Sequence, residues 1–192
     1  KSICGYNLWM VLYWSYATFK SNEKITVISQ VKVRKANIRD NIFLSRVHNF
    51  GVKGGYFCGK QVIKPKDRIF WLKNQLSQKH ITIYVGEIAK EKKAMGYVKF
   101  ERVTHNIWEV TLANLPSFIG KGLGSKMLGL AIQRLKKYRK VSKIVAVVKN
   151  GNIASQKCFL KKKFLKKKFN TKIHKTLNQY DAEKNLYFEL SD

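Results

Sequence analysis

Acidic residues are scarce in this chain. Its 192 residues include 11 Asp and Glu against 39 Lys and Arg, which gives a formal net charge of +28 at pH 7. A field this positive favours anionic ligands, namely phosphorylated small molecules, nucleic acid or an anionic membrane. Arginine is scarce as well: 7 of the 39 basic residues are Arg, and the other 32 are Lys, spread over almost every segment. A dedicated nucleic-acid face more often clusters arginine, so this composition does not by itself indicate one.

Cysteine is also rare. Cys4, Cys58 and Cys158 are widely spaced and form neither a C-x-x-C pair nor a zinc-ligand pattern, so the sequence predicts no metal site. A cytoplasmic, reducing location is therefore expected. No internal repeat is present, and the length suits one domain with a sizeable core.

The sequence lacks a hydrophobic run of the length typical of a membrane span. Residues 3–19 are apolar and uncharged, but they are short, aromatic and interrupted by Asn7, Ser15 and Thr18. No small-residue cleavage site follows, so a signal peptide is not expected. We interpret residues 1–24 as an apolar N-terminal extension ahead of one domain over residues 25–192. The extension either associates with a membrane or is a poorly ordered or packed segment without such a role.

Three alternating glycines mark the most informative stretch, residues 114–128. An extended run over residues 107–115 leads into it, and a helical run over residues 122–138 leads out of it. Glycine lets the backbone approach a ligand closely, and the first amides of a helix have no partners within the helix. With the positive end of the helix dipole, such amides form an anion site. Gly120, Gly122 and Gly124 therefore predict a loop that cradles a diphosphate by its main chain.

Other interpretations of the glycine-rich segments fit less well. A dinucleotide fingerprint requires G-x-G-x-x-G, whereas residues 120–124 read G-x-G-x-G. An RNA-clamping GXXG loop would need glycine at position 123, where the chain has Leu123. A glycine-rich strand-to-helix turn that binds no ligand is a further alternative. Residues 54–61 nearly match a P-loop, but Gln61 replaces the magnesium-binding hydroxyl and no strand precedes them.

Hydrophobic periodicity predicts a mixed series of strands and helices. The predicted strands are 25–36, 80–88, 94–101, 107–115, 142–149, 165–174 and 184–190, and the predicted helices are 37–49, 67–76, 122–138 and 153–164. The apolar residues expected to face the core from the first two helices are Ile38, Ile42, Phe43, Val47, Phe70, Trp71 and Leu76.

This element order and two motifs resemble the GNAT acetyltransferases over residues 30–190. Residues 119–124 are similar to the family's acetyl-CoA loop, Arg/Gln-x-x-Gly-x-Gly/Ala, with Ile119 in place of the leading Arg or Gln. Asn152-x-x-Ser155-x-x-x-Phe159 resembles the family's second segment, where Lys163 replaces a usual glycine. Within the family, the sequence most resembles the amino-sugar-nucleotide acetyltransferases of pseudaminic-acid biosynthesis and their ribosomal-protein-acetylating relatives. The residues that support this resemblance are 33–36, Asp40, 47–49, 70–72, Leu76, 96–100 and Glu109.

The resemblance implies a mixed α/β structure, the acyl-CoA N-acyltransferase fold. Its mostly antiparallel sheet splays at the central strands, has helices on both faces, and takes acetyl-CoA as cosubstrate in the splay. The implied binding residues are Leu112, Ala113, Asn114 and Leu115 beside the pantetheine, Gly120, Lys121, Gly122, Leu123, Gly124 and Ser125 around the diphosphate, and Asn152, Ser155 and Phe159 along the pantetheine arm. Asn152 has a second interpretation as a simple helix cap.

The implied chemistry is direct transfer of an acetyl group to a neutral primary amine, with no metal. Glu109 is the candidate base, and a surface carboxylate on a half-exposed strand is the alternative. At Phe159 the family often has a tyrosine that protonates the leaving thiolate, which phenylalanine cannot do. Cys158 should point about 100° away around the helix and is not expected to act as a nucleophile.

The acceptor is expected against residues 37–49, residues 50–61 and the segment before the last strand. The favoured acceptor is a small-molecule amine, an amino sugar on a nucleotide, and a protein or ribosomal-protein amine is the alternative within the enzyme class. A third hypothesis is a degenerate basic module that binds RNA or an anionic membrane, because Ile119, Phe159 and Lys163 depart from the family pattern. The lysine run over residues 161–168 is interpreted as a solvated face, with a phosphate patch as the alternative.

Overall fold

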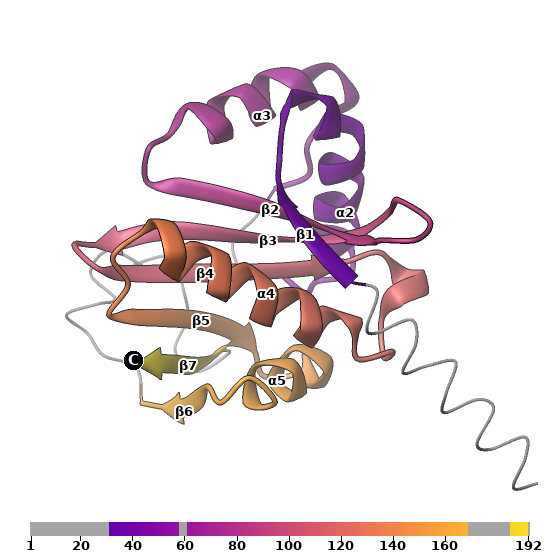
Figure 1. Cartoon of the computed structure of the whole chain (residues 1–192). Coiled ribbons are helices and arrows are strands. Elements are labelled where there is room, and N and C mark those ends of the chain that lie inside the picture. The colour runs from indigo at the N-terminus through magenta and orange to yellow at the C-terminus, as the bar shows by residue number, and fades with distance from the viewer. Residues whose placement is uncertain (1–30, 58–60, 169–184, 192) are drawn as a thin grey trace, which may run out of the picture.

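The computed structural model describes residues 31–57, 61–168 and 185–191, and within them the chain forms a mixed sheet flanked by helices (Figure 1). The strands are β1 (Val31–Lys35), β2 (Ile81–Ile88), β3 (Lys93–Thr104), β4 (Ile107–Asn114), β5 (Lys143–Lys149), β6 (Leu165–Lys167) and β7 (Asn185–Ser191). The α-helices are α2 (Asn41–Lys53), α3 (Arg68–Ser77), α4 (Leu123–Tyr138) and α5 (Ile153–Leu160), with short 3-10 turns η1 (Ile38–Asp40), η2 (Pro65–Asp67) and η3 (Pro116–Phe118).

The sheet opens between its two parallel strands. Its order is β1-β2-β3-β4-β5-β7-β6, and all neighbours are antiparallel except β4 and β5, which α4 connects. β4 and β5 are in register only from Ile107 opposite Lys143 to Glu109 opposite Val145. Both strands continue beyond these pairs, to Asn114 and Lys149. The splayed, mostly antiparallel sheet predicted from the resemblance is therefore confirmed.

Helices cover both faces of the sheet (Figure 1). Alternation along β2 directs Ile83 and Val85 to one face and Tyr84 to the other. The first face packs on α2 and α3 through Leu44, Val47 and Leu72. The second packs on α4 and α5 through a larger set of buried residues, among them Leu123, Met127, Leu128, Ala131, Leu135 and Phe159. The helices thus stabilise the sheet from both faces without filling the opening between β4 and β5.

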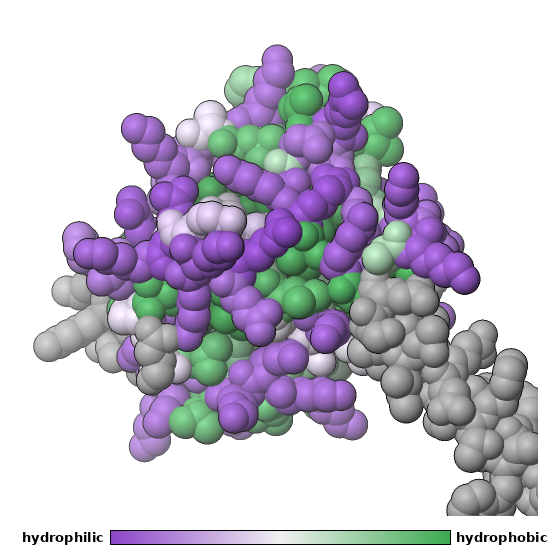
Figure 2. All heavy atoms as spheres, in the orientation of Figure 1, coloured by the Kyte–Doolittle hydropathy of each residue, from purple (hydrophilic) through white to green (hydrophobic). Residues whose placement is uncertain are grey.

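Helix α4 shows why the sequence folds this way locally. Its apolar residues recur at helical spacing and are buried, whereas Gln133, Arg134, Lys136 and Lys137 are exposed. Figure 2 shows hydrophilic side chains spread over much of the face of the molecule that α4 crosses in Figure 1. No helix in the described segments is long and apolar enough to cross a membrane.

The predicted order of elements is confirmed along the described residues, and so is the burial of Val47. Phe43, Trp71 and Leu76 pack partly buried against the core as predicted, whereas Ile38, Ile42 and Phe70 are exposed, so the prediction is wrong for these three residues. Ile38 and Ile42 are 38% and 63% exposed, because η1 is a separate turn and the buried stripe of α2 runs through Leu44 and Val47. Phe70 is 76% exposed, since α3 packs on the sheet through Leu72, with Trp71 and Leu76 partly buried beside it.

Several predicted boundaries also move or cannot be compared. The helix predicted over residues 153–164 ends at Leu160. The strand predicted over 165–174 is described only as β6, because residues 169–184 lie outside the described part of the chain. The N-terminal extension at residues 1–24, the first residues of the strand predicted at 25–36, and residues 58–60 lie outside it as well.

Candidate active site

A cavity of about 370 Å³ occupies the opening between β4 and β5. Helices α2, α4 and α5 and the glycine loop complete its walls. Of the predicted site residues, the cavity brings together Glu109, Leu112, Ala113, Asn114, Gly120, Gly122, Gly124, Ser125, Asn152, Ser155 and Phe159. Three predicted residues do not line it, namely Leu115, Lys121 and Leu123.

The exceptions have structural explanations. Leu123 is 1% exposed and belongs to the core under α4. The backbone N–H of Leu115 donates to the Met95 carbonyl at 2.8 Å, so it continues the pairing with β3. Lys121 is exposed in the loop between two lining glycines. Its backbone belongs to the loop, but its side chain is not part of the cavity wall.

The edge of β4 presents unpaired backbone groups to this cavity. In an antiparallel pair, alternate residues direct both N–H and C=O toward the partner strand. Because Leu115 bonds to β3 and Leu112 stands opposite Val98, the N–H groups of Leu112 and Asn114 point away from β3. They face the side where β5 has left the register. This edge can bind an extended ligand as an added strand would.

The glycine loop requires glycine at its turns. Gly120 and Gly122 have φ of +79° and +76°, in the left-handed region that side chains disfavour. Gly122 immediately precedes Leu123, so the first amides of α4 face the loop with no partner within the helix. Ser125 is buried in this first turn and its hydroxyl donates to the Gly122 carbonyl at 3.4 Å. The loop and the helix dipole together suit a diphosphate.

Asn114 joins the glycine loop to the strand edge. Its Oδ1 atom is buried and has no hydrogen-bond partner among the described residues. A Cβ added to Gly124 would stand 2.6 Å from Asn114 Nδ2, so the side chain fills the space that this glycine leaves. A buried acceptor without a partner is costly unless a ligand or water satisfies it. Oδ1 itself is packed against Gly96 of β3, while Nδ2 of the same amide lies against Gly124 at the glycine loop.

Helix α5 forms the opposite wall. Asn152 caps it, since its Oδ1 accepts a hydrogen bond from the Ser155 N–H at 3.1 Å. Phe159 is buried, with its ring 5.0 Å from that of Phe164 between centroids. Cys158, the neighbour of Phe159 on the same helix, also lines the cavity. Burial raises the pKa of its thiol to about 11, against the opposing effect of Lys162 and Lys161.

Charge is unevenly distributed around the cavity. Glu109 is half-buried on β4, on the face of the sheet that α2 and α3 cover. Lys157 and Lys161 line the cavity from α5, one turn apart. Lys161 begins the lysine run for which a phosphate patch is the alternative interpretation, whereas nothing in the sequence distinguishes Lys157 from the many other lysines. The described ranges contain no cluster of three or more His, Cys, Asp or Glu side chains that could hold a metal ion.

Comparison with known proteins agrees with this geometry. The family model described as the acetyltransferase (GNAT) family matches residues 56–164, which is more than half of the chain. The chain belongs to the GNAT acetyltransferase family. It is accordingly an acetyl-CoA-dependent N-acetyltransferase. No curated protein matches the sequence.

Solved structures share the GNAT fold at low sequence identity. A spermidine N-acetyltransferase from Vibrio cholerae, solved with CoA and spermine, is 17% identical with a TM-score of 0.68, over 85% of this chain and 96% of that one. A ribosomal-protein-alanine N-acetyltransferase from Brucella melitensis is 18% identical with a TM-score of 0.66, over 84% and 99%. A ribosomal-protein-S5-alanine acetyltransferase from Vibrio fischeri is 16% identical with a TM-score of 0.64, over 84% and 93%.

Proposed function

We propose that this GNAT enzyme acetylates the primary amine of a small acceptor, an amino sugar carried on a nucleotide. Acetyl transfer is supported by one observation: the unpaired edge of β4 and the glycine loop line the same cavity. Acetyl-CoA contains both an amide-bearing arm and a diphosphate. The N–H groups of Leu112 and Asn114 suit the arm, and the amides from Gly120 to Ser125 suit the diphosphate.

In the reaction, the lone pair of the neutral amine attacks the thioester carbonyl carbon. The new C–N bond forms, the C–S bond breaks, and the sulfur leaves as a thiolate. We assign the proton lost by the amine to Glu109, directly or through one water. A backbone N–H at the free β4 edge stabilises negative charge on the carbonyl oxygen. Phe159 has no proton to give, so the thiolate takes its proton from water.

The nucleotide-linked acceptor is supported by the composition of the acceptor side. Phe50, Tyr56 and Phe57 line the cavity from α2 and the segment after it. Aromatic faces stack on bases and on the apolar faces of sugars. The formal charge of +28 favours an acceptor that carries phosphate.

The test is an acetyl-transfer assay with the full chain, acetyl-CoA and three acceptors in parallel. The acceptors are a UDP-linked amino hexose, spermidine and a peptide with an N-terminal alanine. Thiol release and the mass of the product are measured together, and we expect acetylation of the amino hexose at the highest kcat/KM. Preference for the peptide or spermidine would overturn the acceptor assignment. Binding of acetyl-CoA without transfer to any amine would indicate a degenerate module instead.

A further inference from the structure

One long segment of the chain carries many basic residues and no acidic residue. Residues 110–168 contain 16 Lys and Arg and neither Asp nor Glu. The surfaces of folded domains usually intersperse both signs of charge. A compositional preference for Lys over Arg would not remove acidic residues, and Asp and Glu occur on both sides of this segment. The region that contains α4, α5 and β6 is therefore the part of the chain most suited to an anionic partner.

The charge is densest in residues 160–168, which we call the lysine turn. They end α5 and begin β6, the strand at one end of the sheet order. The exposed lysines of the turn are Lys161, Lys163, Lys166, Lys167 and Lys168. Lys162 instead lies over α4, where its Nζ atom would be 2.9 Å from a Cβ added at Gly129.

The lysine turn has a fixed base inside the protein. Phe159 and Phe164 are buried, and their ring centroids lie 5.0 Å apart. The backbone N–H of Phe164 donates to the Phe159 carbonyl at 3.2 Å. The N–H of Lys163 donates to the Leu160 carbonyl at 2.9 Å. The exposed lysines therefore extend from a backbone that the core and these hydrogen bonds hold in place.

A neighbouring carboxylate does not neutralise the lysine turn. Glu189 of β7 stands opposite Leu165 in the pairing of β6 with β7. It forms an ion pair with the Nζ atom of Lys143 at 2.9 Å. Because Lys143 balances this acidic charge, the potential over the lysine turn stays positive.

Two leucines are exposed among these lysines. Leu160 is 53% exposed and Leu165 is 59% exposed. Figure 2 shows hydrophobic residues between hydrophilic ones at the lower edge of the molecule, where α5 and β6 lie in Figure 1. Lysine clusters bind acidic lipid headgroups, and exposed leucines enter the boundary between headgroups and acyl chains. The lysine turn combines both features of a surface that binds an anionic membrane.

The lysine turn is less suited to nucleic acid. Proteins that bind single-stranded RNA stack its bases on exposed aromatic rings, whereas Phe159 and Phe164 are both buried. Every basic residue of the turn is Lys, although the planar guanidinium of Arg matches phosphate geometry better. Exposed leucines add nothing to the binding of a phosphate backbone. The combination therefore favours a lipid surface.

We propose that the lysine turn docks this enzyme on an anionic membrane. Its exposed lysines contact acidic headgroups, while Leu160 and Leu165 enter the interface. Lys161 also lines the active-site cavity, so docking places that cavity beside the membrane. The proposal is independent of the acceptor, because it requires no particular amine.

The first test measures co-sedimentation of the full chain with phosphatidylcholine vesicles, with and without about 30% phosphatidylserine, at about 0.1 M salt. The charge variant combines Lys166→Gln, Lys167→Gln and Lys168→Gln. The matched control removes the same charge from exposed positions in α3 and the turn before it, with Lys64→Gln, Lys66→Gln and Lys73→Gln. We expect the wild type to bind only the vesicles with phosphatidylserine. Partition should fall about hundredfold in the charge variant and less than about threefold in the control.

The second test separates membrane docking from attraction by charge alone. Leu165→Gln leaves the net charge unchanged and should lower partition onto the anionic vesicles about fivefold. Ile69→Gln, at a residue of α3 that is 52% exposed, is the control and should bind as the wild type does. The affinity for acetyl-CoA, measured by calorimetry without vesicles, should be equal in all these variants, because none of the substituted residues lines the cavity.

Equal partition of the charge variant and its control would overturn the proposal, since binding would then follow net charge or another segment. Full binding by Leu165→Gln would also overturn it. A single-stranded RNA that binds the wild type, loses affinity for the charge variant and keeps it for Leu165→Gln would assign the turn to nucleic acid instead. Acetyl transfer is assayed without vesicles, so failure of membrane docking and failure of the proposed function are distinguishable.

Discussion

Asn114, at the end of β4, and Gly124, in the first turn of α4, are in contact with no room for another side chain between them. A Cβ on Gly124 would stand 2.6 Å from Asn114 Nδ2. The same amide carries the buried Oδ1 atom that has no partner among the described residues. One contact thus joins the two parts of the proposed acetyl-CoA site, the free strand edge and the glycine loop.

This contact predicts the effect of Gly124→Ala. The added methyl pushes the Asn114 amide toward the cavity, so the affinity for acetyl-CoA should fall by about tenfold, or about 1.4 kcal/mol. The free energy of unfolding should change by less than about 1 kcal/mol, because alanine is a better helix former than glycine. Calorimetric titration with acetyl-CoA and thermal unfolding measure the two quantities.

The matched control is Gly129→Ala in the same helix. There the added Cβ would meet the Nζ atom of Lys162 at 2.9 Å, and that flexible side chain can move. Its affinity for acetyl-CoA should equal that of the wild type. Equal affinities in all three proteins would show that Asn114 does not shape the acetyl-CoA site.

The proposed base predicts a loss of turnover without a loss of acetyl-CoA binding. Glu109→Gln keeps the shape of the side chain but cannot accept the proton from the acceptor amine. Removal of a general base typically lowers the rate by about 10²–10⁴-fold. We therefore expect kcat to fall in that range while the Kd of acetyl-CoA is unchanged. Glu91→Gln, at an exposed carboxylate in the turn before β3, is the control and should retain full kcat. Full activity in Glu109→Gln would exclude this carboxylate as the base.

Much of the fold could be predicted from the sequence because its periodicity is strong where the packing is simple. The apolar stripe of α4 and the apolar run of β5 have one structural solution each, and both are found close to the expected residues. The glycine loop was equally readable, since Gly120 and Gly122 occupy backbone conformations that other residues disfavour. Each of these signals lies within a single helix, strand or loop, so it can be recognised without knowledge of the tertiary structure.

The remaining features depend on contacts between distant segments. Ile42 and Phe70 are as apolar as core residues, and only the docking of α2 and α3 on the sheet decides that they are exposed. A second cavity, of about 110 Å³, combines residues from two helices, three strands and the segment after α2. No spacing within one segment indicates that Trp71 and Thr111 share a wall. Tertiary packing therefore determines which residues form the proposed acceptor site, whereas the sequence indicated only the segments expected to contribute to it.

Lys163 marks a position where the chain departs from the family pattern at a cost in stability. It follows α5 with a φ of 63°, and the Phe164 N–H closes the helix end on the Phe159 carbonyl at 3.2 Å. Glycine adopts this left-handed cap without the steric penalty of a side chain. We expect Lys163→Gly to raise the free energy of unfolding by about 1 kcal/mol. Denaturant unfolding measures the change, and Lys161→Gly, where φ is −60°, should be destabilising instead. A loss of stability in Lys163→Gly would contradict this account.

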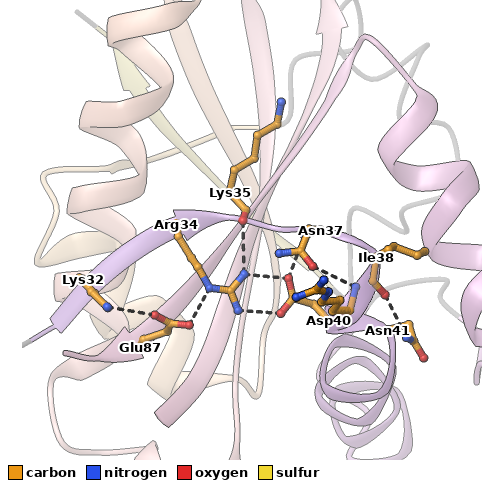
Figure 3. Close-up of polar contacts among 9 residues, drawn as sticks. Lys32, Arg34, Lys35, Asn37, Ile38, Asp40, Asn41 and Glu87 are labelled. Atoms are coloured by element: carbon orange, nitrogen blue, oxygen red, sulfur yellow. Dashed lines mark hydrogen bonds and ion pairs between the residues drawn. The ribbon is translucent and has the colours of Figure 1, made fainter. Parts of the chain in front are cut away.

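Asp40 is held by Arg34 in a two-pronged ion pair (Figure 3). Arg34 donates to Asp40 Oδ1 at 2.7 Å and Oδ2 at 2.8 Å, and to Glu87 Oε1 at 2.6 Å. Burial tends to raise the pKa of Asp40, but hydrogen bonds from Arg34 and from the Asn37 N–H outweigh it and lower the pKa. The contact ties β1 and β2 to the start of α2.

This ion pair predicts a pH dependence of stability. A carboxylate with a lowered pKa stabilises the fold above its unfolded pKa of about 3.9, and that stability is lost as the pH falls through the folded pKa. Asp40→Asn should lower the free energy of unfolding at pH 7 by about 2 kcal/mol. It should also reduce the loss of stability below about pH 4. Lys32→Gln is the control, because Lys32 contacts Glu87 only at 3.5 Å and is half exposed, and its effect should be small. Equal stability curves for Asp40→Asn and wild type would refute the prediction.

Cys158 lines the cavity but is not suited to covalent catalysis. Burial raises the pKa of its thiol to about 11, so at pH 8 roughly one molecule in a thousand carries the thiolate. Site-resolved mass spectrometry should therefore show slow alkylation of Cys158 by iodoacetamide at pH 8, with a rate that rises about tenfold per pH unit up to pH 10. Acetyl-CoA should slow it further, because the thiol faces the cavity that the ligand would fill. Cys158→Ala should retain kcat within about twofold, since direct transfer requires no acetylated enzyme. Loss of activity in Cys158→Ala, together with an acetyl group trapped on Cys158 in the wild type, would replace direct transfer with a two-step mechanism.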